Sequence, residues 1–211
     1  MAKKIKLAKS RKLAYKWICA TFSRDAYLRE IIDADRAHIF GSGKIDAKQN
    51  GQASSYSNAI SKADFDYAQK LAFYVVMTYG TLDELLDLCL ESDQKIKNNL
   101  KYAFRLSAAE SLYLDKEDYI VVSQGVELVR SFNRHADKFA NAILRKVCQK
   151  AKTFAGDAAS ELQKYSRLYG LPQDFIELVI AEHGQDFALK YFDTNLQVAP
   201  THLVNFCVDK S

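Results

Sequence analysis

Helix-breaking residues are scarce in this chain, and their scarcity constrains its fold more than any other feature. Only two prolines and eight glycines occur among the 211 residues. So few breakers favour long helices over a sheet of many strands and turns. Apolar residues also recur every three or four positions, as Leu13, Trp17, Ile18 and Phe22 do. We therefore predict an all-α fold of at least seven helices, without internal repeats, sustained heptads or βαβ alternation.

The predicted helices fall into two groups of unequal size. Residues 1–153 are expected to form one helical bundle, interrupted at 41–61 by a long flexible loop rich in Gly, Ser, Asn and Gln. The composition shifts near 154–156, and residues 154–199 predict a small helical linker subdomain of three short helices. Residues 200–211 alternate like a strand and are expected to begin another unit.

One helix boundary inside the bundle is predicted from its end signals. A helix that begins near Lys62 is expected to run to Tyr79, where Gly80 fits a helix stop. Thr81 then fits the N-cap of the next helix, because Glu84 follows it at the spacing of a capping box.

Positive charge is concentrated in two segments. Residues 1–24 carry eight Lys/Arg and no acid, which leaves 22 basic against 26 acidic residues in the remainder. Residues 130–152 carry seven Lys/Arg against one acid, Asp137. A basic arm on a mildly acidic body indicates a polyanionic partner, either nucleic acid or a membrane surface. A solvated tail is the alternative for the arm.

In the second basic segment, helical spacing separates core from surface. Ile143, Leu144 and Val147 are expected to face the core, which leaves the basic side chains outward. Such charges would bind RNA phosphates with little sequence selectivity. The candidate RNA contacts from both segments are Lys3, Lys4, Lys6, Lys9, Arg11, Lys12, Lys16, Arg134, Arg145, Lys146 and Lys150. Tyr15 and Tyr165 are candidates for stacking on unpaired bases, with helix packing as the alternative.

No catalytic or metal-binding constellation is recognisable. The glycines of residues 40–44 lack the spacing of a phosphate loop, and the four histidines lack zinc spacing. The four cysteines lie far apart, so we expect reduced, mostly buried thiols and an intracellular, cytoplasmic protein. No apolar run is long enough to span a bilayer, and neither a membrane nor a metal is expected as a partner.

An ordered set of segments resembles the NusB family of all-α RNA-binding antitermination proteins. The segments are KSRKLAYKWICATF, TLDELLDLCL, KIKNNLKYAFRLSAAESLYL, VVSQGVELVRSF and FANAILRKV. The last resembles the family signature F-V-N-A-V-L-R, which it matches at Phe139, Asn141, Ala142, Leu144 and Arg145. The resemblance implies a NusB-like antitermination-type helical bundle.

The later part of the chain resembles one branch, the Sun/Fmu family of 16S ribosomal RNA cytosine-5 methyltransferases. The segment that begins YSRLYGLPQDF is similar to that family's linker, and APTHLVNFCVDKS to the entry into its methyltransferase half. Arg145 also fits this branch, because stand-alone NusB proteins tend to have an acid there. The resemblance implies that the catalytic domain, with its S-adenosylmethionine cofactor and two active-site cysteines, lies beyond Ser211. None of the four cysteines here matches those positions.

By resemblance, the chain is a module that docks or orients ribosomal RNA for that methyltransferase, with no cofactor and no catalytic residue of its own. A NusB-type antitermination or protein-interaction module, with a ribosomal protein as partner, is the alternative. The chain departs from the family pattern at six positions, two of which are Glu117 and Gln124, in place of a Pro and a Glu. Tyr74 and Met77 replace a Gly and an Arg, so no RNA contact is carried over to that helix, and Tyr119 and Ser123 replace a His and an Asn.

Overall fold

The computed structural model describes residues 6–24, 26–40, 60–91, 96–195 and 197. These residues contain ten α-helices and one short 3-10 helix, and no strand occurs among them, which confirms the predicted all-α fold. The helices are α1 (Lys9–Arg24), α2 (Leu28–Phe40), α3 (Lys62–Met77), α4 (Tyr79–Asp87), α5 (Asn98–Tyr113), α6 (Asp118–Phe132), the 3-10 helix η1 (Arg134–Ala136), α7 (Asp137–Ala151), α8 (Glu161–Tyr169), α9 (Gln173–His183) and α10 (Gln185–Asn195). Apart from residues 60 and 61, the predicted loop at 41–61 lies outside the described residues, as does the strand predicted within 200–211.

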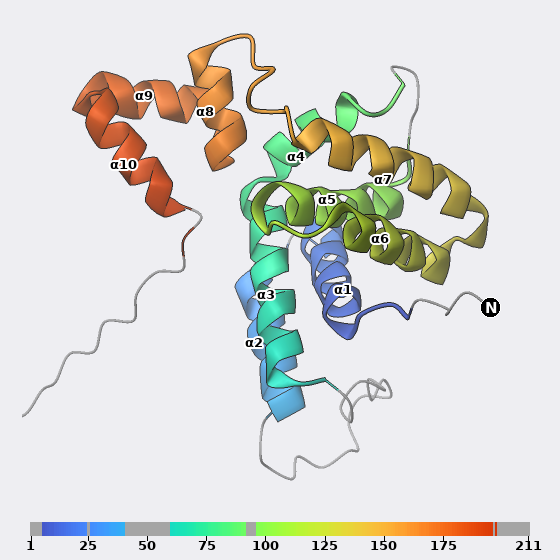
Figure 1. The fold of residues 1–211 in the computed structure, drawn as a ribbon. Helices are drawn as coiled ribbons and strands as arrows, with labels where there is room; N and C mark the ends of the chain where they lie inside the picture. The colour runs from blue at the N-terminus through green and yellow to red at the C-terminus, as the bar shows by residue number, and fades with distance from the viewer. Residues whose placement is uncertain (1–5, 25, 41–59, 92–95, 196, 198–211) are drawn as a thin grey trace, which may run out of the picture.

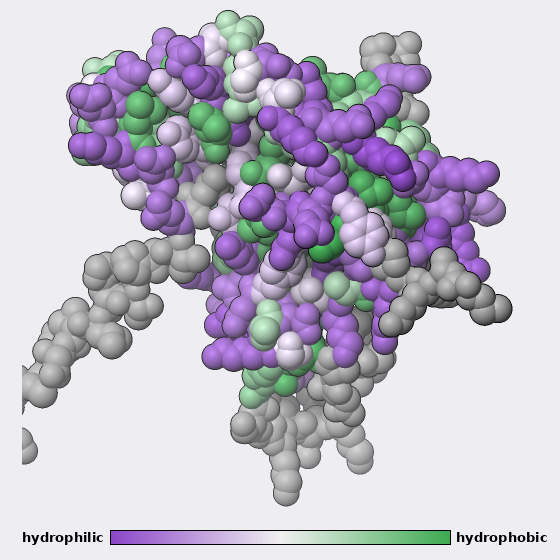
Figure 2. Space-filling model, viewed as in Figure 1, coloured by the Kyte–Doolittle hydropathy of each residue, from purple (hydrophilic) through white to green (hydrophobic). Residues whose placement is uncertain are grey.

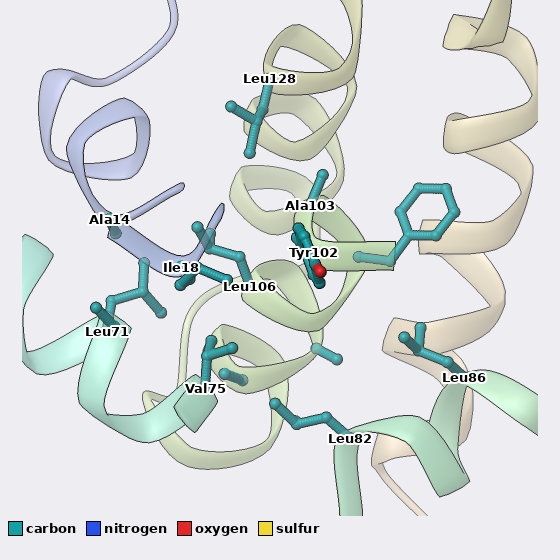
Figure 3. Close-up of a cluster of buried hydrophobic side chains, with 14 of the residues drawn as sticks. Ala14, Ile18, Leu71, Val75, Leu82, Leu86, Tyr102, Ala103, Leu106 and Leu128 are labelled. Atoms are coloured by element: carbon teal, nitrogen blue, oxygen red, sulfur yellow. The ribbon is translucent and has the colours of Figure 1, made fainter. Parts of the chain in front are cut away.

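Helix α5 is the centre of the bundle. Ten of its sixteen residues are buried, and the burial is continuous from Tyr102 to Glu110, so every face of this stretch is covered. Helices α1, α3, α4, α6 and α7 all pack against it (Figure 1). Figure 3 shows Ile18 of α1, Val75 of α3 and Leu106 of α5 converging in the core.

The junction between α3 and α4 differs from the prediction. Helix α3 ends at Met77 and α4 begins at Tyr79, so Gly80 and Thr81 lie inside α4 rather than at its border. Thr78 occupies the N-cap position without a side-chain cap hydrogen bond. Thr81 is buried, and its hydroxyl donates to the carbonyl of Ser166 at 3.4 Å. A tertiary partner in α8 therefore holds the hydroxyl that the local pattern assigned to a capping box.

Helices α8, α9 and α10 form a small subdomain with its own core of Ile176, Val179, Ala188 and Phe192 (Figure 1). Phe154, the first residue after the predicted division, is fully buried in the core of the bundle. Local end signals explain the bounds of α8: Ser160 caps its start, and Gly170 ends it with φ of 68°.

Arg167 joins this subdomain to the bundle. Its Nε and Nη2 donate to Oε1 of Glu84 in α4 at 3.1 and 2.8 Å, and its Nη1 donates to the carbonyl of Phe154 at 2.6 Å. The guanidinium also lies 4.4 Å from the centre of the Phe154 ring. Although α8 is short, a buried cation with several partners thus holds it against α4.

Candidate nucleic-acid interface

Helix α7 has the strongest separation of core and surface in the basic part of the chain. Its buried residues are Ala140, Ile143, Leu144, Val147 and Cys148, which confirms the predicted core positions. The opposite face carries Arg145 and Lys146 in exposed positions. The basic residues occupy positions of α7 that, by helical spacing, do not face the core.

A groove of about 670 Å³ lies between α6 and α7. Val122 and Val126 of α6 form part of its apolar wall, and Asn141 and Gln149 of α7 provide amide groups. Tyr119 lines its end and is 69% exposed. Figure 2 shows green side chains set among purple ones on the right of the molecule, where Figure 1 places α6 and α7. The groove therefore combines apolar surface with hydrogen-bonding side chains.

The charges of the groove are not equally available. Arg130 pairs with Glu127 and, at 3.2 Å, with Asp137, so its charge is already compensated. In the part of the chain that the structure describes, neither Lys138 nor Arg145 forms an ion pair. The Nε of Arg145 lies 3.5 Å from Oδ1 of Asn141, a long contact at most. Two cations are thus open to an anionic ligand.

A second hollow, of about 410 Å³, lies on the other side of the exposed face of α7. It is lined by Lys146 and Lys150 of α7 and by Leu88 and Cys89 beyond the end of α4. Lys150 pairs with Asp157 at 2.7 Å and lowers the pKa of that carboxyl through this hydrogen bond. Burial raises the pKa of the Cys89 thiol. We call the exposed face of α7 between the two hollows, made of Asn141, Arg145, Lys146 and Gln149, the basic ridge.

The N-terminal basic segment reaches α6. Gln124 of α6 accepts from the backbone N–H of Ala8 at 2.8 Å and donates to the carbonyl of Lys6 at 3.0 Å. Lys6, Lys9, Lys12 and Lys16 are exposed, and Lys16 pairs with Asp35 of α2 at 2.8 Å. Arg134 is exposed in η1. Lys3 and Lys4 lie outside the described residues.

Arg11 lies in the core, not on the predicted RNA-binding surface. It is 4% exposed, and its Nε donates to both carboxylate oxygens of the fully buried Glu110, at 2.7 and 2.8 Å. Tyr67 donates its hydroxyl to the same carboxylate at 2.7 Å, and this environment raises the pKa of Tyr67, first through burial and then through the charge of Glu110. A cation that is buried and paired in this way has no surface for a phosphate to reach.

The two tyrosines suggested for base stacking are occupied by helix packing. Tyr15 stacks on Phe132 with ring centres 5.3 Å apart, and its hydroxyl donates to the carbonyl of Asn99. Tyr165 packs on Tyr169 within the small subdomain. The alternative reading, helix packing, therefore describes both residues.

The remaining residues of the NusB-like signature, and the positions that depart from the family pattern, have varied surroundings. Phe139 packs on Phe104 of α5, whereas Ala142 is exposed. Tyr74 stacks on Tyr113 of α5, and Met77 is exposed at the end of α3. Ser123 lines the groove beside Tyr119. Tyr119 and Ser123 of α6 thus line the groove, whereas Tyr74 and Met77 of α3 do not.

Several groove residues had no signal in the sequence. Val122, Val126 and Gln149 come from two helices, and each looks ordinary within its own helix. Only the packing of α6 against α7 brings them together. Lys138 belongs to the second basic segment, in which the local sequence does not distinguish it from the paired Arg130.

The described ranges contain no group of three metal-ligating side chains, and none of the helices in them is both long and apolar enough to cross a bilayer. The described bundle presents an exposed helix face with two adjacent cations, Arg145 and Lys146, beside a groove.

The chain belongs to the NusB family, whose model matches residues 8–149. The match spans α1 to α7 and includes the basic ridge, and it ends before the small subdomain. NusB family domains are RNA-binding, antitermination-type modules with RNA and protein partners. No curated protein and no solved structure matches the chain.

Proposed function

We propose that this NusB-family module binds ribosomal RNA through the basic ridge and presents it to an S-adenosylmethionine-dependent cytosine-5 methyltransferase. The observation that carries the proposal is the pair of adjacent cations, Arg145 and Lys146, that open to two sides of α7. Neither forms an ion pair among the described residues, so both are free to neutralise phosphates.

Three further features support an RNA ligand. Lys138 adds a third such cation at the start of α7, and Lys6 lies where the N-terminal segment meets α6. The amides of Asn141 and Gln149 can donate to or accept from base edges. The exposed ring of Tyr119 at the end of the groove offers a face for stacking, a role that Tyr15 cannot fill because Phe132 covers it.

The link to a methyltransferase is supported by the resemblance of the segment from Tyr165 onward to the Sun/Fmu linker, and by Arg145 in place of an acid. In this proposal the module supplies RNA contacts, and the cofactor and catalytic cysteines belong to the methyltransferase domain. The small subdomain held by Arg167 would transmit the position of the bundle to that domain.

RNA binding is tested with fragments of small-subunit ribosomal RNA, by measuring affinity against salt concentration. Each phosphate neutralised contributes a slope of roughly −0.7 to −0.9 in log K against log salt. The double variant R145E/K146E should therefore bind at least about tenfold more weakly and show a slope that is shallower by about 1.5. The matched control K190E makes the same kind of charge change at an exposed residue of α10 and should leave the slope unchanged.

Salt-independent affinity, or equal loss in the control, would exclude the ridge as a phosphate-binding surface. If the variant retains RNA binding but loses a protein partner that survives nuclease treatment, the antitermination-type interaction module is the better assignment.

A further inference from the structure

The small subdomain carries a continuous row of aromatic rings that extends from its core, at Phe192, to exposed positions. In order of contact the row is Phe175, Phe192, Tyr191, Phe187 and His183, with ring centres 6.4, 6.0, 6.4 and 5.0 Å apart. Phe192 is buried and anchors the row, whereas Tyr191 is 49% exposed and Phe187 51% exposed. Phe187 and Tyr191 stack nearly parallel, with their planes 6° apart. We call these five residues the aromatic row.

The charge around the aromatic row is opposite in sign to that of the basic ridge. Helices α9 and α10 contain five acids and one lysine, Lys190. Their acids are Asp174, Glu177, Glu182, Asp186 and Asp193, and all five are exposed. Figure 2 shows green and pale side chains set among purple ones in the upper left, where Figure 1 places α9 and α10. The described part of this subdomain thus combines exposed aromatic rings with an excess of exposed acids.

We propose that the aromatic row is a docking site for an arginine-rich segment of a protein partner. Guanidinium groups stack on the faces of aromatic rings and pair with carboxylates at the same time, which lysine does less well. The acids repel phosphate, so RNA is a poor occupant of this surface. The four exposed rings are joined in one row through the buried Phe192, whereas scattered single surface aromatics need no explanation.

This inference goes beyond the proposed function and does not depend on it. The aromatic row lies outside residues 8–149, the part that belongs to the NusB family. The molecule would therefore hold RNA on a cationic surface of the bundle and a cationic protein segment on an acidic surface of the subdomain, without competition between the two.

The test uses the full chain and three synthetic peptides. The peptides share one sequence except at alternating positions, which are all Arg in the first, all Lys in the second and all Glu in the third. Binding is measured by calorimetry. The arginine peptide should bind most tightly, the lysine peptide at least about fivefold more weakly, and the glutamate peptide not at all. F187S/Y191S and E182K/D186K should each weaken the arginine peptide by at least about tenfold.

Matched controls separate the aromatic row from general effects. Y27S removes an exposed aromatic residue from the bundle, and D66K/E91K reverses two exposed acids there. Both should bind the arginine peptide like the wild type, and circular dichroism should show every variant folded. Equal affinity for the arginine and lysine peptides, or wild-type binding by F187S/Y191S, would overturn the proposal. If the chain dimerises in analytical ultracentrifugation and F187S/Y191S abolishes the dimer, the aromatic row is instead an interface between copies. If F187S/Y191S loses RNA affinity, the aromatic row is an RNA surface.

Discussion

Gly125 of α6 lies directly against Leu144 of α7. A Cβ atom at Gly125 would be 2.5 Å from Leu144 Cδ1 and 2.6 Å from Ser107 Oγ of α5. Three helices therefore meet at a point where only a hydrogen atom fits. Leu144 immediately precedes Arg145, so this close approach also sets how α7 presents the basic ridge.

Substitution of Gly125 by Ala should destabilise the fold. The added methyl group must displace two buried neighbours, and overpacking of this kind costs about 1–3 kcal/mol. Improved helix propensity returns up to about 1 kcal/mol. We expect the free energy of unfolding, measured by urea denaturation, to fall by about 1–2 kcal/mol.

Gly80 provides the matched control for this substitution. It lies in the first turn of α4 and has no atom within 4 Å of an added Cβ. G80A should be neutral or stabilising by up to about 1 kcal/mol. Equal effects of the two substitutions would show that helix propensity, and not the contact with Leu144, decides the outcome.

Loss of Arg11 should affect stability and not RNA binding directly. In R11M the carboxylate of Glu110 remains buried without its cation, and breaking a buried pair costs roughly 3–5 kcal/mol. The double variant R11M/E110L removes both charges and should be more stable than R11M alone. Thermal unfolding of both variants measures this.

R24M, an Arg-to-Met change at an exposed position of the same helix, should shift stability by less than about 0.5 kcal/mol. If R11M folded with wild-type stability and bound RNA weakly, Arg11 would belong to the RNA surface after all.

These two contacts show which parts of the structure the sequence predicts and which it does not. Periodicity predicts Ile143, Leu144 and Val147 as core residues because the spacing of apolar residues along a helix shows which face is buried. Periodicity also counts Arg11 as a surface cation, because its partner Glu110 is 99 residues away and nothing local reveals the pair. Charge counts therefore included one buried residue, Arg11, among the cations of the N-terminal segment.

Tertiary contacts likewise decide the features at helix ends. The Thr81–Glu84 pattern is a valid capping signal, yet Ser166 and Arg167 of α8 hold these two side chains in the fold. The groove follows the same rule, since its walls come from α6 and α7 and neither helix predicts it alone. Packing between helices, which local sequence patterns do not encode, explains both the changed role of Thr81 and the groove.

Substitution of Arg167 should release the small subdomain. R167M removes the hydrogen bonds to Glu84 and to the carbonyl of Phe154, and R167K cannot replace them because one ammonium does not reproduce the geometry of the guanidinium. Both variants should increase the rate of protease cleavage between residues 152 and 160 by at least about tenfold. A free energy of opening that is lower by about 1.4 kcal/mol makes the open population tenfold larger. K164M, which removes an exposed cation from the same helix, should be cleaved at the wild-type rate.

The carboxylate of Asp83 should make stability depend on pH in the acid range. Burial alone would raise its pKa, but hydrogen bonds from Arg105, at 2.7 Å, and from Lys101, at 2.9 Å, outweigh burial and hold the pKa below its usual value. A depressed pKa in the folded state stabilises the fold above the unfolded value of about 4, and this contribution disappears as the pH falls through the lower folded value. D83N should therefore lose about 2 kcal/mol at pH 7 and show a flatter decline below pH ~4 in chemical denaturation. D87N removes the same charge from an exposed position of α4 and should keep the wild-type profile; parallel profiles for the wild type and D83N would show that Asp83 does not control acid stability.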